Sequence, residues 1–255
     1  MDTREQVARL FAVARATRAL YLNFLGRHDF AAALAPDCFQ PLALESDPSK
    51  TLFSILVFEL AGARPAWAPA WCSRLAPCFI QSNWRFYGTV SGLPEGERPG
   101  VLFWRTLTDS RLLALYGRRI VRSLPAHYVG RMKLARQGDQ VSASAPPHFE
   151  FLGRLAKGAE LPAALHGRYA DFAAFARGVM EQRLAVTVGQ REVVAQDLRL
   201  GVESARVLPL EPLWVEVAGV EEFVENPARP EACFLVEDLE VELNSVRVIP
   251  RANRT

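Results

Sequence analysis

The segment FIQSNWRFYGTV, residues 79–90, carries the strongest fold signal in this sequence, together with VLFWRTLT at residues 101–108. Both segments are rich in aromatic and β-branched residues, as strands are. The linker between them, SGLPEGERPG, is rich in glycine and proline. This arrangement predicts two antiparallel strands joined as a hairpin.

The segments after this hairpin predict one helix and a second hairpin. Residues 109–124, DSRLLALYGRRIVRSL, predict a short helix that Asp109 or Ser110 caps. The apolar residues expected on its buried side are Leu112, Leu113, Leu115, Tyr116 and Ile120. Residues 126–145 then predict two strands that meet in a turn at Gly138.

The second half of the chain mixes one helix with β-prone segments. Residues 171–188, DFAAFARGVMEQRLAVTV, predict a helix that is capped by Asp171 and leads into a strand. The expected fold class is therefore α+β, mainly antiparallel β, as a barrel or sandwich with a few peripheral helices. No shift in composition divides the chain, so we expect a single domain over residues 1–255.

The N-terminal segment has a helical rather than a strand pattern. Apolar side chains recur at three- and four-residue spacing over residues 3–25, which predicts an amphipathic helix. Thr3 followed by Gln6 has the spacing of a capping box. We expect this helix to pack on the sheet, with a partner-binding helix as the alternative.

Three prolines break the segment ARPAWAPAWCSRLAP, residues 63–77, which predicts a loop with one helical turn. Trp67 and Trp71 lie four residues apart in it. The preferred interpretation is a loop that covers a core, and the alternative is a lid over a pocket.

Charge is unevenly distributed, although the net charge is only +2. Residues 98–136 contain nine lysines or arginines and one acid, whereas residues 211–242 contain ten acids and one base. The simplest interpretation is that the two blocks meet in the fold or lie on separate solvated faces. The small net charge favours neither a nucleic-acid nor a membrane partner.

The cysteines and the N-terminus indicate a soluble protein of the cytoplasm. Cys38, Cys72, Cys78 and Cys233 show no CxxC spacing, so we expect free thiols in a reducing compartment and no metal site. Arginines interrupt every apolar run near the start, and no apolar stretch is long enough to span a membrane.

Several motifs occur together in an order that resembles the acetoacetate decarboxylase-like superfamily. An Asn-x-Arg-x-Tyr strand (residues 83–87) precedes a Pro-Gly-hydrophobic strand (residues 99–103), a helix ending in Gly117-Arg118, and Leu124-Pro125 before a strand. The similarity covers about residues 79–135 and is greatest to a bacterial branch of that superfamily. It implies a cone-like β-barrel with one internal cavity.

The resemblance also implies a chemistry that this sequence lacks. In the decarboxylases of the superfamily, a Pro-Lys-Lys segment supplies the lysine that forms a Schiff base, and the neighbouring charge lowers the pKa of that lysine. Here Pro125 is followed by Ala126 and His127. The acid expected after Gly-Arg is Arg119, and a second expected acid corresponds to Gln81. Schiff-base decarboxylation is therefore not expected, and no cofactor is implied.

Lys133 is the one nearby lysine that offers an alternative. If residues 126–134 form one strand, His127, Arg131 and Lys133 point to the same face, and Arg131 could lower the pKa of the amine. A lyase using Lys133, with His127 as a second weak catalytic candidate, is one possible function. The plainer interpretation is a surface lysine, because the other face of this strand is more apolar.

The function best supported by the sequence is the binding of a small anionic organic ligand. The candidate ligand-binding residues are Gln81, Arg85, Tyr87, Arg105 and Arg118. An arginine that faces an apolar interior needs a carboxylate or an anionic ligand beside it. The remaining alternative is a structural or interaction role for the basic 116–136 segment, which would then contact the acids of another subunit in a homo-oligomer.

Overall fold

The computed structural model describes residues 7–8, 12–93, 96–119, 126–189 and 192–250. The helices and short helical turns are α1 (His28–Leu34), η1 (Ala70–Arg74), α2 (Arg111–Arg119), η2 (Ala163–Leu165), α3 (Phe172–Met180) and η3 (Val202–Ser204). The strands are β1 (Val7–Ala8), β2 (Ala12–Arg27), β3 (Phe39–Pro41), β4 (Lys50–Pro65), β5 (Phe79–Val90), β6 (Arg98–Thr108), β7 (Ala126–Tyr128), β8 (Lys133–Gln137), β9 (Gln140–Ala145), β10 (Phe149–Leu155), β11 (Leu184–Val188), β12 (Glu192–Leu200), β13 (Arg206–Val217) and β14 (Ala232–Pro250).

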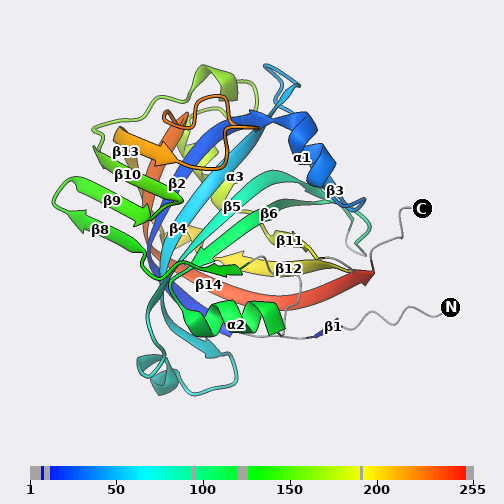
Figure 1. Ribbon diagram of the computed structural model, residues 1–255, viewed down its shortest axis with the longest axis vertical. Helices are drawn as coiled ribbons and strands as arrows, with labels where there is room; N and C mark the ends of the chain where they lie inside the picture. Colours follow the sequence, from blue (N-terminus) through cyan, green and yellow to red (C-terminus); the bar gives the residue numbers. More distant parts are fainter. Residues whose placement is uncertain (1–6, 9–11, 94–95, 120–125, 190–191, 251–255) are drawn as a thin grey trace.

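These strands form one mainly antiparallel sheet (Figure 1), which confirms the expected class. The order along the sheet is β12-β11-β6-β5-β4-β2-β14-β13-β10-β9-β8, and the pairings β6–β11 and β6–β7 are parallel. At one end β12 also pairs with β14, whereas at the other end the order stops at β8. The sheet as a whole is not closed, so the predicted barrel is not confirmed.

Several local predictions are confirmed. β5 and β6 form the expected antiparallel hairpin, and β8 and β9 form the second hairpin around Gly138, which has a positive φ of 63°. Ser110 caps α2, since its Oγ accepts from the Leu113 amide at 3.2 Å. Asp171 caps α3 in the same way, at 2.7 Å from the Ala174 amide.

The predicted N-terminal helix over residues 3–25 is wrong wherever the structure describes the chain. Residues Ala12–Arg27 form β2, which lies between β4 and β14. Five consecutive residues from Leu20 to Phe24 are buried, because both faces of this strand are covered. The strand therefore lacks the alternation that identifies a half-buried strand.

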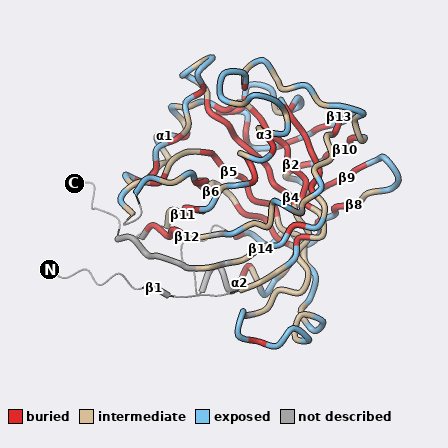
Figure 2. Tube along the Cα trace, turned by 180° about the vertical axis from the view of Figure 1, so that it is seen from behind, coloured by how far each residue is buried: buried red, intermediate tan, exposed pale blue. Residues whose placement is uncertain are grey.

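Two hydrophobic cores lie on the two faces of the sheet, and the buried residues run through its centre (Figure 2). The first, here called the Trp84 core, includes Phe53, Trp84, Phe86, Leu102 and Phe149. The second, here called the Tyr21 core, includes Tyr21, Leu56, Phe103, Phe175 and Phe234. α3 covers the Tyr21 core through Phe175 and Val179. Because side chains alternate along a strand, β5 contributes to both cores.

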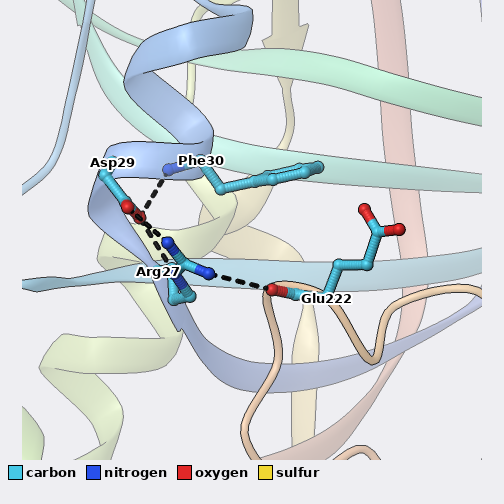
Figure 3. A network of polar contacts seen from close by, with 4 residues as sticks. All are labelled: Arg27, Asp29, Phe30 and Glu222. Carbon is cyan, nitrogen blue, oxygen red and sulfur yellow. Dashed lines mark hydrogen bonds and ion pairs between the residues drawn. The ribbon is translucent and has the colours of Figure 1, made fainter.

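A polar network holds the end of β2 against the loop before β14 (Figure 3). Arg27 donates from Nε to Asp29 Oδ1 at 3.0 Å and from Nη1 to the Glu222 carbonyl at 3.5 Å, while Asp29 also accepts from the Phe30 amide. The Phe30 ring stacks on Phe223 with centroids 4.4 Å apart. The network thereby aligns α1 with the edge of the Trp84 core.

Other predictions differ from the structure around the helix α2. Leu112 and Leu115 are exposed rather than buried, whereas Ala114 is buried. β7 and β8 are separate strands, because Gly130 has a φ of 57° and breaks the expected continuous strand. The two charge blocks meet at an ion pair between Arg136 and Glu237. All four cysteines are free, and none of the described helices is long and apolar enough to cross a membrane.

Candidate ligand site at Arg85

Strand β5 places a line of polar side chains on the face that carries the Tyr21 core. Gln81, Asn83, Arg85 and Tyr87 occupy alternate positions, so they share one face. Gln81 Nε2 donates to Asn83 Oδ1 at 2.7 Å, and Arg85 Nη2 donates to Tyr87 Oη at 3.1 Å. Asn83, Arg85 and Tyr87 are buried, and Gln81 is half-buried.

Arg85 is the centre of this line and is only 4% exposed. Its guanidinium carbon lies 5.4 Å from the ring centroid of Tyr21 and 5.3 Å from that of Tyr87. Nη2 also donates to the Val179 carbonyl of α3 at 3.5 Å. Nε is buried without a hydrogen-bond partner. The guanidinium therefore has donor capacity that its described neighbours do not use.

No carboxylate forms an ion pair with Arg85 among the described residues. The neighbours that interact with it electrostatically are the phenols of Tyr87 and Tyr21. Burial raises the pKa of Tyr21 to about 12, although Arg85 opposes the rise. Burial likewise raises the pKa of Tyr87. Both phenols are therefore neutral at neutral pH and supply no counter-charge.

The charge on Arg85 persists despite its burial. Burial lowers the pKa of Arg85, but interactions with Tyr87 and Tyr21 raise it by more, so the net shift is upward. An arginine side chain does not lose its proton under ordinary conditions. The interior thus contains one positive charge that the described residues do not neutralise.

A chain of hydrogen bonds fixes Tyr87 in place. Tyr87 Oη donates to Ser54 Oγ at 3.0 Å, Ser54 Oγ donates to Asn23 Oδ1, and Asn23 Nδ2 donates to the Ala232 carbonyl at 3.1 Å. The strand register explains this chain, because Arg85 lies opposite Ser54, Ser54 opposite Asn23, and Asn23 opposite Ala232. One row of residues therefore connects four strands.

A second row on the same face contains two buried hydroxyls whose hydrogen bonding is incomplete. Tyr21, Leu56, Asn83, Thr106 and Ala126 lie opposite one another along this row. Tyr21 Oη and Thr106 Oγ1 are both buried without a hydrogen bond of good geometry, although the Tyr21 hydroxyl interacts with the guanidinium of Arg85. Unsatisfied buried hydroxyls are uncommon and costly, so they point to a bound group that would accept their protons.

The structure brings together three of the predicted site residues, Gln81, Arg85 and Tyr87. Arg105 lies opposite Trp84 across the hairpin, on the other face, where its guanidinium carbon is 4.5 Å from the Trp104 ring centroid. Arg118 belongs to α2, but its side chain lies outside the described part of the structure.

The two weak catalytic candidates lie elsewhere. His127 is exposed on β7, and Lys133 is exposed at the start of β8, where it pairs with Ser144 of β9. Ala126 is buried beside Thr106. Ala126, one of the two residues that stand where the resemblance expects lysines, therefore lies on the face that carries Thr106.

Sequence reasoning missed Tyr21, Asn23, Ser54 and Thr106 as members of this site. They are polar residues within long apolar strands, such as SILVF around Ser54. That signal is weak by itself, because the face of each residue depends on strand register.

A surface pocket of about 320 Å³ lies apart from Arg85. Its lining includes Glu160, Phe172, Glu211, Pro212, Pro230, Glu231, Ala232 and Cys233. Its connection to the buried row is Ala232, whose carbonyl accepts from Asn23. This pocket is acidic, and it is consequently a poor place for an anion.

No family model and no curated protein matches the sequence. Solved structures do match the fold. An acetoacetate decarboxylase-like enzyme from Sphingomonas wittichii RW1 is 11% identical, with a TM-score of 0.60 over 96% of this chain and 95% of that chain. Acetoacetate decarboxylase from Legionella pneumophila is 10% identical, with a TM-score of 0.61 over 98% and 90%.

A third similar structure is the enduracididine biosynthesis enzyme MppR in complex with pyruvate. It is 10% identical, with a TM-score of 0.57 over 96% of this chain and 91% of that chain. Identities near 10% establish a common fold and not a common activity. The chain therefore shares the fold of acetoacetate decarboxylase-like proteins.

Proposed function

We propose that the protein binds a small organic anion, most simply a carboxylate, against the guanidinium of Arg85. The observation that carries this proposal is a fully buried arginine with no carboxylate partner among the described residues. A buried, unpaired charge is strongly unfavourable, and an anion of opposite charge removes that cost.

The geometry around Arg85 suits a carboxylate. A guanidinium can donate two parallel hydrogen bonds to one carboxylate group. Nε has no partner, and the bond from Nη2 to the Val179 carbonyl is long at 3.5 Å. The buried hydroxyls of Tyr21 and Thr106 add two further donors on the same face. Gln81 is half-buried at one end of the polar line, so the ligand is proposed to enter from that end.

The similar structures support a small-molecule site in this fold, since MppR has been solved with pyruvate bound. The additional β12–β14 pairing supports the barrel with an internal cavity that the sequence resemblance implies. Four free cysteines support a reducing compartment such as the cytoplasm.

We do not extend the proposal to Schiff-base decarboxylation. Ala126 and His127 stand where the resemblance would require lysines, and Ala126 lies beside Thr106 on the face that carries Arg85. Lys133 is exposed on β8, the last strand in the order of the sheet. A lyase function through Lys133 has no structural observation in its favour.

Isothermal titration with a series of short carboxylates, each paired with its neutral amide, tests this function. The wild-type protein is expected to bind at least one acid and not the matching amide. Arg85→Met is expected to abolish that binding, whereas Arg105→Met serves as the matched control because Arg105 lies on the opposite face. Equal binding by wild type and Arg85→Met would overturn the proposal.

Because Arg85→Met could alter the fold, Arg85→Lys provides a second variant. It keeps the positive charge but loses the two-pronged donor geometry. Weaker but measurable binding of the same acid is expected. Wild-type binding strength in Arg85→Lys would show that the guanidinium has no specific role.

A further inference from the structure

A projecting arm joins β4 to β5. This arm, residues 61–78, extends beyond the paired part of the two strands, since the β4–β5 pairing ends at Leu60 and Phe79. It contains η1 and lies at the lower end of the molecule in Figure 1, a position that Figure 2 shares. The sequence predicts a loop that covers a core, but the large side chains of the arm do not cover one.

The large apolar side chains of the arm face solvent. Trp67 is 84% exposed, Trp71 is 61% exposed and Leu75 is 75% exposed. Arg64 Nη1 donates to the Ala68 carbonyl at 2.7 Å, and the Ser73 hydroxyl donates to the Ala70 carbonyl. Internal hydrogen bonds therefore give the arm a defined shape while its tryptophans stay outside. Such exposed aromatic residues are typical of protein interfaces.

The arm is also positively charged. No aspartate or glutamate occurs between Glu59 and Glu95. Arg74 is exposed beside Trp71. The arm is thus suited to a surface that is both apolar and acidic.

The same chain carries such a surface. We call it the acidic face: the 320 Å³ pocket together with the outer side of the β10–β13 pair. The pocket is lined by Glu160, Glu211, Glu231, Phe172, Pro212 and Pro230. The next residues of β13, Leu213 and Trp214, are exposed, the latter by 58%.

Two glutamates on this face are placed against each other. Glu150 of β10 lies directly opposite Glu216 of β13, and both are exposed. Like charges in such cross-strand pairs are destabilising. Glu150, Glu160, Glu216 and Glu231 form no ion pair within the described residues, whereas Glu211 pairs with Arg154. A cationic partner would relieve this repulsion.

The arm cannot reach the acidic face of its own chain. The longest axis of the molecule is vertical in Figure 1, with the arm at the lower end and β10 and β13 in the upper half. A contact between them needs two molecules. We propose that the arm of one copy docks on the acidic face of a second copy, with a tryptophan in the pocket and Arg74 among the glutamates.

This contact joins two different surfaces, so it is heterologous. Repetition of a heterologous contact produces a closed ring or an open chain of subunits. The pocket volume lies within the range of pockets that hold small organic groups, and one indole is such a group. Tryptophan and arginine are also the residues that most often dominate interface affinity.

Sedimentation velocity over a concentration series tests the proposal with the full chain. The wild type is expected to self-associate, and Trp67→Ala with Trp71→Ala is expected to raise the dissociation constant by about tenfold or more. Leu112→Ala with Leu115→Ala on α2 is the matched control, since it removes exposed apolar side chains outside the arm. This control is expected to associate like the wild type.

A charge exchange makes the test specific for the two surfaces. Arg74→Glu and Glu216→Arg are each expected to weaken association alone, and an equimolar mixture of the two variants is expected to restore it. When the two variants alternate in the assembly, every contact joins opposite charges. Circular dichroism confirms that each variant is folded before it is used.

Three results would overturn the proposal. One is a wild type that stays monomeric at every concentration. The second is association that the arm variants leave unchanged. The third is binding of the arm to anionic phospholipid vesicles without self-association, which would make a lipid surface the occupant instead.

Discussion

The guanidinium of Arg85 donates to the hydroxyl of Tyr87, two residues further along β5, and both side chains are buried. The pair combines a permanent positive charge with a phenol whose pKa burial raises, so the charge is not neutralised by its partner. A stable interior normally pairs such a charge with a carboxylate. The exception at Arg85 is the reason to regard this region as a ligand site.

Replacement of Arg85 by methionine is expected to stabilise the ligand-free protein. The change removes a buried unpaired charge, and Tyr87 Oη keeps its bond to Ser54. We expect the free energy of unfolding in urea to rise by about 1–3 kcal/mol. A loss of stability of that size would instead indicate that Arg85 has a structural partner outside the described residues.

The two tyrosines beside Arg85 are expected to differ when each is changed to phenylalanine. Tyr87→Phe removes the bonds to Arg85 and Ser54 and should cost about 1–3 kcal/mol of unfolding free energy. Tyr21→Phe removes a hydroxyl that interacts with Arg85 without good hydrogen-bond geometry, so it should cost clearly less. The two variants have the same chemistry, so each serves as the control for the other. Equal losses would contradict the assigned hydrogen bonds.

Stability is expected to fall at alkaline pH because of Tyr21. Burial raises the pKa of Tyr21 from 10.0 to about 12, so the folded state holds the phenolic proton more tightly than the unfolded state. This stabilisation is complete below pH 10 and is lost as the pH rises towards 12. It amounts to about 2–3 kcal/mol.

Urea unfolding between pH 8 and pH 12 measures this loss in wild type and Tyr21→Phe. The wild-type curve should fall more steeply between pH 10 and pH 12. Burial also raises the pKa of the Cys233 thiol, but both proteins contain this group, so its effect cancels in the difference. Identical slopes would show that Tyr21 does not titrate as a buried phenol.

The hairpin of β5 and β6 and the caps of α2 and α3 could be predicted because their signals are local. Turn residues, alternating aromatics and the caps Ser110 and Asp171 act over a few positions in sequence. Gln81, Arg85 and Tyr87 could be predicted as one group for the same reason, since alternation on a single strand places them together.

Residues 12–27 could not be assigned correctly because their structure depends on distant strands. β2 is rich in alanine and arginine, which favour a helix in isolation, yet β4 and β14 bury it on both faces. The residues that hold Tyr87 beside Arg85 were unpredictable on similar grounds. Ser54 and Asn23 join this hydrogen-bond chain only through the registers of β4 and β2, which the sequence does not encode locally.

Removal of residues 1–25 is expected to abolish folding, although the N-terminal segment is a strand and not the predicted helix. The deletion removes most of β2 and leaves the edges of β4 and β14 unpaired in the middle of the sheet. It also removes Tyr21 and Asn23 from the candidate site. Expression as insoluble protein, or loss of the cooperative thermal transition, is the expected result. A soluble deletion variant with the wild-type melting temperature would contradict this placement of β2.

Borohydride treatment in the presence of pyruvate or acetoacetate is expected to give no covalent adduct. Schiff-base formation needs an amine beside the bound carbonyl, and Ala126 and His127 stand where the resemblance requires lysines. Lys133 is exposed, so it should react no faster than other surface lysines. Intact-mass spectrometry reads the result directly, with Lys133→Arg as the control that keeps the charge. An adduct of stoichiometric yield that disappears in Lys133→Arg would establish a lyase-type amine and displace the binding function proposed for Arg85.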